Sequence, residues 1–166
     1  MEIGLYGLGR MGANMVRRLV RGGEHRVVAG NRSPGPVDEL VSEGPEGAYS
    51  MEEMVEMLSP PRVIWTMVPA GDVTEQTLLT LAGMMDEGDI LIDGGNSYFR
   101  DTIRRAEMLR ERGLRFLDAG TSGGVWGLQV GYCLMVGGDE QYVKPLEPVF
   151  LSLAPEGGYL HVGGAP

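Results

Sequence analysis

The sequence has a single cysteine, Cys133, so it cannot form an internal disulfide, as expected in a reducing cytoplasm. It has no apolar run near the roughly 18 residues that a membrane-spanning helix needs, and no basic segment precedes its first apolar residues. Basic residues are also scarce, because 14 Lys and Arg face 23 Asp and Glu, for a formal net charge of −9. This charge disfavours nucleic acid and anionic membranes as partners. We therefore expect a soluble, acidic, cytoplasmic globular protein.

Internal repeats and linkers are absent as well. The 27 glycines and 10 prolines are not periodic, and strong apolar runs lie between them, which argues against collagen and against disorder. A chain of 166 residues predicts one domain, over residues 1–166.

Short apolar runs alternate along the chain with segments whose apolar residues recur every three or four positions. The runs predict strands over residues 2–6, 26–29, 63–68, 90–92, 114–117, 132–136 and 159–162. The periodic segments predict helices over residues 10–21, 54–58, 72–81, 101–112 and 140–153. This alternation predicts an α/β fold of the Rossmann type, with a doubly wound, mostly parallel sheet and helices on both faces.

A glycine-rich loop follows the first predicted strand and precedes the first helix. Its six residues are Gly7, Leu8, Gly9, Arg10, Met11 and Gly12. In a βαβ unit, the first glycine of such a loop permits a tight turn, the second admits a pyrophosphate and the third allows close helix packing. The helix N-terminus behind the loop favours an anion. The loop therefore predicts a dinucleotide site, the alternative being a packing turn without a ligand.

The end of the second predicted strand bears on which dinucleotide binds. NAD sites usually have Asp or Glu there for the ribose hydroxyls, whereas this chain has Asn31, Arg32 and Ser33. A guanidinium can pair with a 2′-phosphate that a carboxylate would repel. We therefore predict NADP as the coenzyme, with NAD as the alternative.

Two more glycine-flanked loops follow predicted strands, at the edge where open α/β sheets bind ligands. One contains Asp93 to Ser97, and the other contains Asp118 to Gly124. Paired glycines expose backbone N–H groups, and Asn and Ser add uncharged donors and acceptors for hydroxyls or a carboxylate. From composition alone, both loops could equally be turns that need positive φ, with Asn96 and Ser122 as local caps.

The segment from Asp93 to Thr102, DGGNSYFRDT, closely resembles the signature loop of decarboxylating 6-phosphogluconate dehydrogenases. The glycine loop, the Asn-Arg-Ser segment and a Ser-Gly-Gly segment occur in the same order and spacing as that family's other motifs. The resemblance spans essentially the whole chain, and the residues after Asp118 are most similar to the shorter bacterial-type branch.

The resemblance implies a role for each matching position. The glycine loop would hold the pyrophosphate, and residues 31–33 would hold the adenosine ribose with its 2′-phosphate. The nicotinamide would lie near the segment Val68, Pro69 and Ala70. Asn96 would touch both coenzyme and substrate. The carboxylate and hydroxyls of a phosphorylated sugar acid would bind Ser122, Gly123 and Gly124.

Departures from the longer branch of the family concern the substrate. Pro69 stands where lysine is common, Tyr98 where glutamate is common, and Val125 and Trp126 follow the Ser-Gly-Gly segment. We expect Pro69 and Val125-Trp126 to alter fine substrate contacts and not the coenzyme site. The shorter branch also includes NAD users.

The family's catalytic residues are missing from this chain. The resemblance implies oxidation and decarboxylation of 6-phosphogluconate to ribulose 5-phosphate, in the pentose phosphate pathway. In that family, a lysine and a glutamate on a helix after a Gly-Ala-Pro or similar segment act as base and acid. This chain stops at Gly164-Ala165-Pro166, and its only lysine, Lys144, is expected to be solvated. We therefore assign no catalytic residue and expect the chain to be inactive alone. In family members a large all-helical domain follows, and it supplies the catalytic pair and the contacts of the homo-oligomer.

Two alternatives stay open. A sibling hydroxyacid dehydrogenase, of the 3-hydroxyisobutyrate or glyoxylate type, shares the glycine loop but usually has a Ser-Thr loop in place of Gly95-Asn96-Ser97. A non-catalytic dinucleotide-sensing module would be a complete, tightly folded monomer. A coenzyme domain without its helical partner should instead expose an apolar patch.

The remaining titratable residues are interpreted as structural. His25 lies in a turn and His161 in a strand, and Cys133, in an apolar strand, is expected to be a buried, inert thiol. Asp93 and Asp118 are expected to hold the N–H groups of loops at their strand ends. No His, Cys or Asp cluster has metal-ligand spacing.

Overall fold

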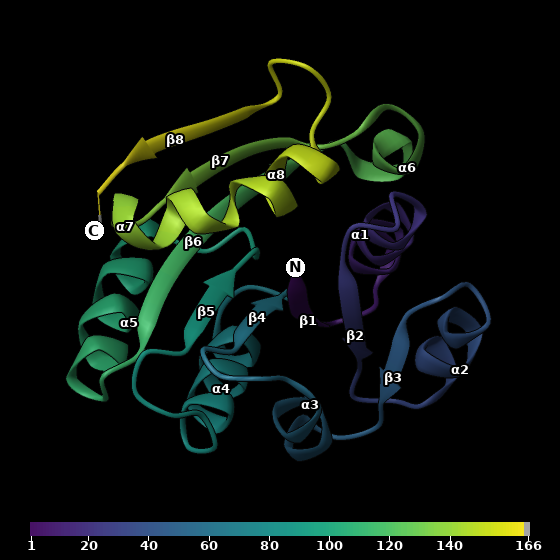
Figure 1. The fold of residues 1–166 in the computed structure, drawn as a ribbon. Coiled ribbons are helices and arrows are strands. Elements are labelled where there is room, and N and C mark those ends of the chain that lie inside the picture. Colours follow the sequence, from purple (N-terminus) through teal and green to yellow (C-terminus); the bar gives the residue numbers. More distant parts are fainter. Residues whose placement is uncertain (165–166) are drawn as a thin grey trace.

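The computed structural model describes residues 1–164, so Ala165 and Pro166, where the family resemblance places a segment before the catalytic helix, lie outside the described residues. Eight strands form one sheet in the order β3-β2-β1-β4-β5-β6-β7-β8 (Figure 1). The strands are β1 Glu2–Tyr6, β2 Arg26–Gly30, β3 Glu46–Ala48, β4 Val63–Thr66, β5 Ile90–Asp93, β6 Arg115–Ser122, β7 Cys133–Gly137 and β8 Tyr159–Gly163. The first six are parallel, β7 runs antiparallel to β6, and β8 is parallel to β7. The predicted Rossmann-type fold is confirmed.

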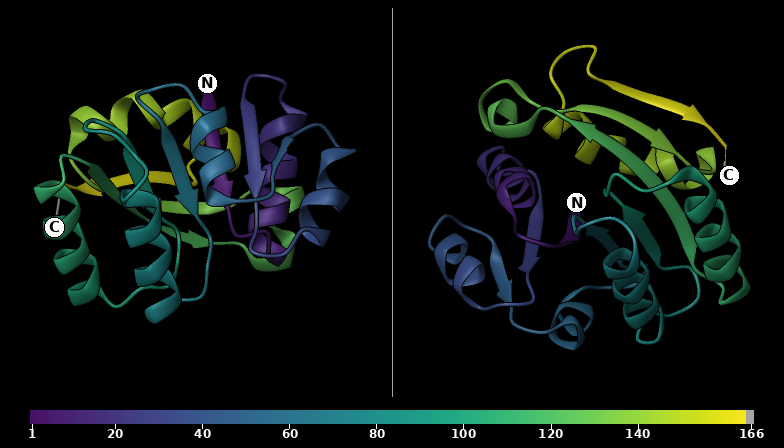
Figure 2. Two further views of the ribbon diagram at one scale, coloured as in Figure 1. Left: turned by 90° about the horizontal axis from the view of Figure 1, so that it is seen from below. Right: turned by 180° about the vertical axis from the view of Figure 1, so that it is seen from behind.

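Helices lie on both sides of this sheet (Figure 2). They are α1 Arg10–Arg21, α2 Gly35–Val41, α3 Met51–Met57, α4 Asp72–Ala82, α5 Phe99–Glu111, α6 Gly127–Val130, α7 Glu140–Val143 and α8 Glu147–Leu153. One apolar core packs α1, α2 and α8 on one face. A second core packs α3, α4 and α5 on the other. No helix in residues 1–164 is long and apolar enough to cross a membrane.

The first βαβ unit matches its predicted boundaries closely. Strand β1 and helix α1 have the predicted bounds, and β2 extends one residue further, to Gly30. At α3 the Ser50 side chain caps the helix, since it accepts a hydrogen bond from the N–H of Glu53 at 3.0 Å. Helix α2 and strand β3 were not predicted.

The segment after residue 117 differs from the prediction. Residues 118–122 were predicted to be loop, but they continue β6, because β7 returns antiparallel and pairs Asp118 with Gly137 and Ser122 with Cys133. Asp118 therefore lies within a strand rather than at its end. The predicted helix over residues 140–153 is broken into α7, a 3₁₀ turn at Lys144–Leu146 and α8. Pro145 and Pro148 explain the break, because each lacks an N–H group and favours a helix start.

The outer face of β7 and β8 has no helix against it in the described chain. Met135 is 44% exposed, Leu160 62% and Val162 56%, while alternating residues such as Leu134 and Val136 belong to the core beneath α8. Cys133 shares the outer face and is exposed. The prediction of a buried thiol is therefore wrong, since burial would have required a covering element on that side of the sheet.

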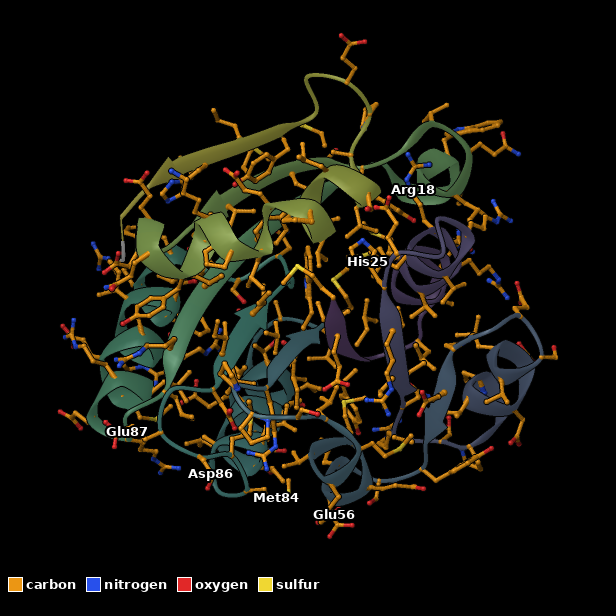
Figure 3. The ribbon with its side chains drawn as sticks, in the orientation of Figure 1. Arg18, His25, Glu56, Met84, Asp86 and Glu87 are labelled. Atoms are coloured by element: carbon orange, nitrogen blue, oxygen red, sulfur yellow. The ribbon has the colours of Figure 1, made fainter. Side chains whose placement is uncertain are left out.

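Both histidines make structural contacts. His25 Nε2 lies 2.8 Å from Ser152 Oγ, and burial lowers the pKa of the imidazole. Arg18 Nε donates to the carbonyl oxygens of Ser152 and Leu153 at the end of α8. Figure 3 labels Arg18 and His25 on the side of α1 and β2 that faces α8. His161 Nε2 lies 2.7 Å from the carbonyl oxygen of Gly138.

Candidate coenzyme site

The glycine loop is shaped by two close backbone approaches. Gly7 has φ +105°, and a Cβ there would lie 2.5 Å from the carbonyl oxygen of Met67. A Cβ on Gly12 would lie 2.0 Å from the carbonyl oxygen of Gly7. Gly9 differs, because a Cβ there would meet nothing within 4 Å. The first and third glycines thus hold the turn against the sheet, and the second faces open space in which a ligand could lie.

The start of α1 is left free for an anion. Within the described chain, no side chain caps this helix at Gly9, and its first turn contains no acidic residue. The backbone N–H groups at the helix start therefore point outward with the positive end of the helix dipole. The side chain of Leu8, in contrast, is buried in the core, so this residue can offer only its backbone to a ligand.

A cavity of about 540 Å³ opens beside this loop. Of the residues predicted to bind the coenzyme, it is lined by Gly7, Gly9, Asn31, Arg32, Ser33, Val68 and Pro69. The structure therefore brings together the glycine loop, the end of β2 and the end of β4. These segments come from the adjacent strands β2, β1 and β4, whose carboxyl ends share one edge of the sheet.

Asn31 organises two of these segments. Its Oδ1 accepts a hydrogen bond from the N–H of Leu8 at 3.0 Å, and its Nδ2 donates to Ser33 Oγ at 3.1 Å. The amide is thus engaged in joining the glycine loop to the residues after β2. Arg32 and Ser33 are exposed at the cavity, where a guanidinium and a hydroxyl can meet a phosphate.

Several residues of the cavity wall were missed from the sequence. Besides Tyr6, Met51 and Met67, one face of α4 contributes Val73, Gln76, Thr77 and Thr80. Their spacing of three, one and three residues is that of a single helix face, so helical periodicity could have identified them.

The residues predicted to bind the substrate are not among the residues of the described chain that line this cavity. Asn96 and Ser122 are both exposed. Asn96 lies three residues beyond the end of β5, and Ser122 is the last residue of β6, at the same edge of the sheet. Gly123 has φ +152° and Gly124 φ +50°, which suits glycine. Arg10, Met11, Gly12 and Ala70 also lie outside the lining; Arg10 follows Gly9 and Ala70 follows Pro69, both of which line the cavity.

Asp93 holds the Asn96 loop, as predicted. Its Oδ1 accepts a hydrogen bond from the N–H of Gly95 at 2.9 Å, and its Oδ2 accepts one from Ser97 Oγ at 2.7 Å. Asp118 does not act in this way: its carboxylate lies against Gly137 of β7, and burial raises its pKa. The difference follows from the extension of β6, which places backbone-paired strand rather than loop around Asp118.

Residues 2–163 match the family model described as the NAD binding domain of 6-phosphogluconate dehydrogenase. The chain is 42% identical over 165 residues to the NAD(+)-dependent, decarboxylating 6-phosphogluconate dehydrogenase of Haloferax volcanii, covering 98% of this chain and 54% of that protein. It is 42% identical over 153 residues to the decarboxylating 6-phosphogluconate dehydrogenase of Haemophilus influenzae, covering 87% and 31%. The chain therefore spans about half the length of the first relative and less of the second.

Solved structures with the same fold include two kinds of dehydrogenase. The 3-hydroxyisobutyrate dehydrogenase of Mycobacterium tuberculosis, determined with L-serine, superimposes with a TM-score of 0.87 at 30% identity, over 99% of this chain and 55% of that one. The 6-phosphogluconate dehydrogenase of Plasmodium falciparum, determined in its apo form, with NADP+ and with 6-phosphogluconate, has a TM-score of 0.86 at 26% identity, over 100% and 36%. With the family match over nearly the whole chain, these similarities identify an NAD(P)-binding domain, and the chain belongs to the 6-phosphogluconate dehydrogenase family.

Proposed function

We propose that this chain is the coenzyme-binding part of an NADP-dependent, cytoplasmic enzyme that oxidatively decarboxylates 6-phosphogluconate. The observation that carries the choice of NADP is Arg32, exposed at the cavity beside the glycine loop, with no acidic residue in the segment that follows β2. A guanidinium there stabilises a 2′-phosphate, whereas NAD sites usually have a carboxylate. NAD is the alternative, since the Haloferax volcanii relative is named as NAD(+)-dependent.

In this proposal the chain's own residues bind and orient. The N–H groups at the start of α1 hold the pyrophosphate, and the loop that contains Val68 and Pro69 receives the nicotinamide, which accepts a hydride when bound. Asn96 contacts coenzyme and substrate, and Ser122, Gly123 and Gly124, at the end of β6, bind the carboxylate and hydroxyls of the sugar acid. The base and acid of the reaction come from a further helical domain, which in the whole protein also forms the contacts of a homo-oligomer.

The exposed apolar side chains support the existence of such a partner domain. Met135, Leu160 and Val162 on the outer face of the sheet and Trp126 and Val130 beside the Ser-Gly-Gly segment are all more than two-fifths exposed. A self-sufficient sensing module would be expected to cover such surface. The Gly95-Asn96-Ser97 sequence favours 6-phosphogluconate over the substrates of sibling hydroxyacid dehydrogenases, which usually have Ser-Thr in this loop.

Replacing the guanidinium tests the coenzyme proposal. In Arg32→Ala, binding of NADPH should weaken by about 1–3 kcal/mol, the value of a charge-assisted pair, while NADH binding changes little. Isothermal titration with both coenzymes measures the difference. Arg21→Ala, an exposed arginine at the far end of α1, is the matched control and should leave both affinities unchanged. Equal losses for the two coenzymes would contradict the NADP assignment.

The isolated chain should not oxidise 6-phosphogluconate, because in this proposal the base and acid that the reaction needs lie in the further helical domain. The measurement is NADPH formation, followed by its ultraviolet absorbance, with a full-length 6-phosphogluconate dehydrogenase as the positive control. Steady NADPH production by this chain would show that residues within it supply both proton transfers.

A further inference from the structure

The guanidinium of Arg105 is buried beneath two of the loops at the binding edge. Helix α5 carries several arginines, and two neighbours differ sharply: the side chain of Arg104 is 53% exposed, whereas that of Arg105 is 2% exposed. Burying a charge costs several kcal/mol unless it is paired and hydrogen-bonded. The position of Arg105 therefore depends on the partners that surround it.

Each nitrogen of this guanidinium has a partner on a different segment. Arg105 Nε donates to Glu75 Oε2 at 2.8 Å, on α4. Its Nη1 donates to Ser97 Oγ at 3.2 Å, and its Nη2 donates to the carbonyl oxygen of Gly71 at 3.2 Å. The Asp93 carboxylate, 1% exposed, lies 3.6 Å from Nη1. The pKa of Glu75 is lowered to about 2, by hydrogen bonds from Arg104 and then from Arg105.

Two of these partners, Gly71 and Ser97, belong to loops that already touch each other. The loop between β4 and α4 ends at Gly71, and the loop between β5 and α5 contains Ser97. The N–H of Gly94 donates to the carbonyl oxygen of Thr66 at 2.9 Å, and a Cβ on Gly95 would lie 3.3 Å from the carbonyl oxygen of Val68. The two loops are thus in contact where they leave β4 and β5, and Arg105 joins them again near their C-terminal ends.

The two loops hold the residues proposed to meet the reactive end of the coenzyme. Pro69 and Val68 line the cavity from the first loop, and Asn96 lies in the second, one residue before Ser97. Pro69 is also held from α4, because Thr74 Oγ1 donates to its carbonyl oxygen at 2.9 Å. A change in the spacing of these loops would move Asn96 relative to the nicotinamide.

We infer that Arg105 is a positioning residue, whose buried guanidinium fixes the β4–α4 loop and the β5–α5 loop relative to each other for the nicotinamide half of the coenzyme. This inference rests on the proposed function. The planar fork of the guanidinium is required, because three directed donors reach Glu75, Ser97 and Gly71 at once, whereas an ammonium is a compact point charge without that fixed geometry.

Arg105→Lys tests this role, because it retains the buried charge and removes the fork. Two ligands are used: NADPH, and adenosine 2′,5′-bisphosphate, which lacks the nicotinamide half. We expect the ratio of NADPH affinity to bisphosphate affinity to fall about tenfold in Arg105→Lys, with bisphosphate affinity within about twofold of the original chain. The fluorescence enhancement of bound NADPH, which reports on the nicotinamide surroundings, should fall in parallel.

Two further variants make the test specific. Arg104→Lys is the matched control, because it makes the same substitution at the adjacent, exposed position that also binds Glu75, and it should retain the original ratio. Ser97→Ala removes the hydroxyl between Arg105 and Asp93 and should lower the ratio severalfold. It carries the test if Arg105→Lys does not fold.

The outcomes separate this inference from the proposed function. If the original chain binds neither ligand, the coenzyme proposal fails, and the inference fails with it. If the original chain binds both ligands and the ratio is unchanged in Arg105→Lys and Ser97→Ala, the inference is overturned while coenzyme binding stands. An equal loss of affinity for both ligands would also overturn it, because that is the effect of a general structural defect.

Discussion

Gly9→Val should abolish dinucleotide binding while leaving the fold intact. A side chain at Gly9 would meet no protein atom within 4 Å of its Cβ, and the residue has extended backbone angles, φ −67° and ψ −176°, that valine can adopt. The added methyl groups would instead occupy the space proposed for the pyrophosphate. Overlap worth about 3 kcal/mol corresponds to roughly a hundredfold loss of affinity or more.

The measurements are NADPH titration and thermal unfolding of the same samples. Gly164→Val is the matched control, because a Cβ there also meets nothing within 4 Å. That residue follows β8, which runs antiparallel to the strands that end at the site. Gly164→Val should leave both affinity and melting temperature unchanged. Unaltered NADPH affinity in Gly9→Val would contradict the proposed role of the glycine loop.

Gly12→Ala should have the opposite pattern and destabilise the fold itself. A Cβ at Gly12 would lie 2.0 Å from the carbonyl oxygen of Gly7, and this backbone oxygen cannot move as the end of a side chain can. Helix α1 would have to shift away from β1, at a cost of about 3 kcal/mol in the free energy of unfolding. Urea denaturation measures this loss.

Gly22→Ala provides the comparison on the same helix. Gly22 has helical angles, φ −72° and ψ −19°, and the nearest atom to an added Cβ is 3.9 Å away. Alanine there should leave the free energy of unfolding unchanged or raise it by a few tenths of a kcal/mol, as is typical of a compatible Gly-to-Ala change. Similar stabilities for the two variants would show that the contact between α1 and the glycine loop is not tight.

The first βαβ unit could be predicted nearly to the residue because its signals are local. Glycines bound the strands, and the apolar spacing of α1 is unbroken from Met11 to Val20. The gathering of Gly9, Arg32 and Val68 around one cavity also followed from the sequence, because carboxyl ends of neighbouring parallel strands meet at one edge.

The features that could not be predicted depend on distant partners. Residues 118–122 have the composition of a loop, and they are extended only because β7 pairs with them. Cys133 has the sequence neighbours of a buried strand residue, but within residues 1–164 no helix covers its side of that strand. Arg105 shares the inward face of α5 with Thr102, Ala106 and Leu109. The helical spacing could therefore have placed it, although its partner Glu75 lies on another helix.

The length of β6 has a consequence for the shape of the binding edge. Asp93, the last residue of β5, is level with Asp118 in the neighbouring strand, and β6 continues four residues further, to Ser122. At roughly 3.3 Å per residue, β6 extends about 13 Å beyond the end of β5. The edge of the sheet is therefore stepped, because β6 and its partner β7 extend past the end of β5 on one side. A molecule resting above β5 is bounded laterally by rigid, hydrogen-bonded backbone, so this boundary exists before any ligand arrives.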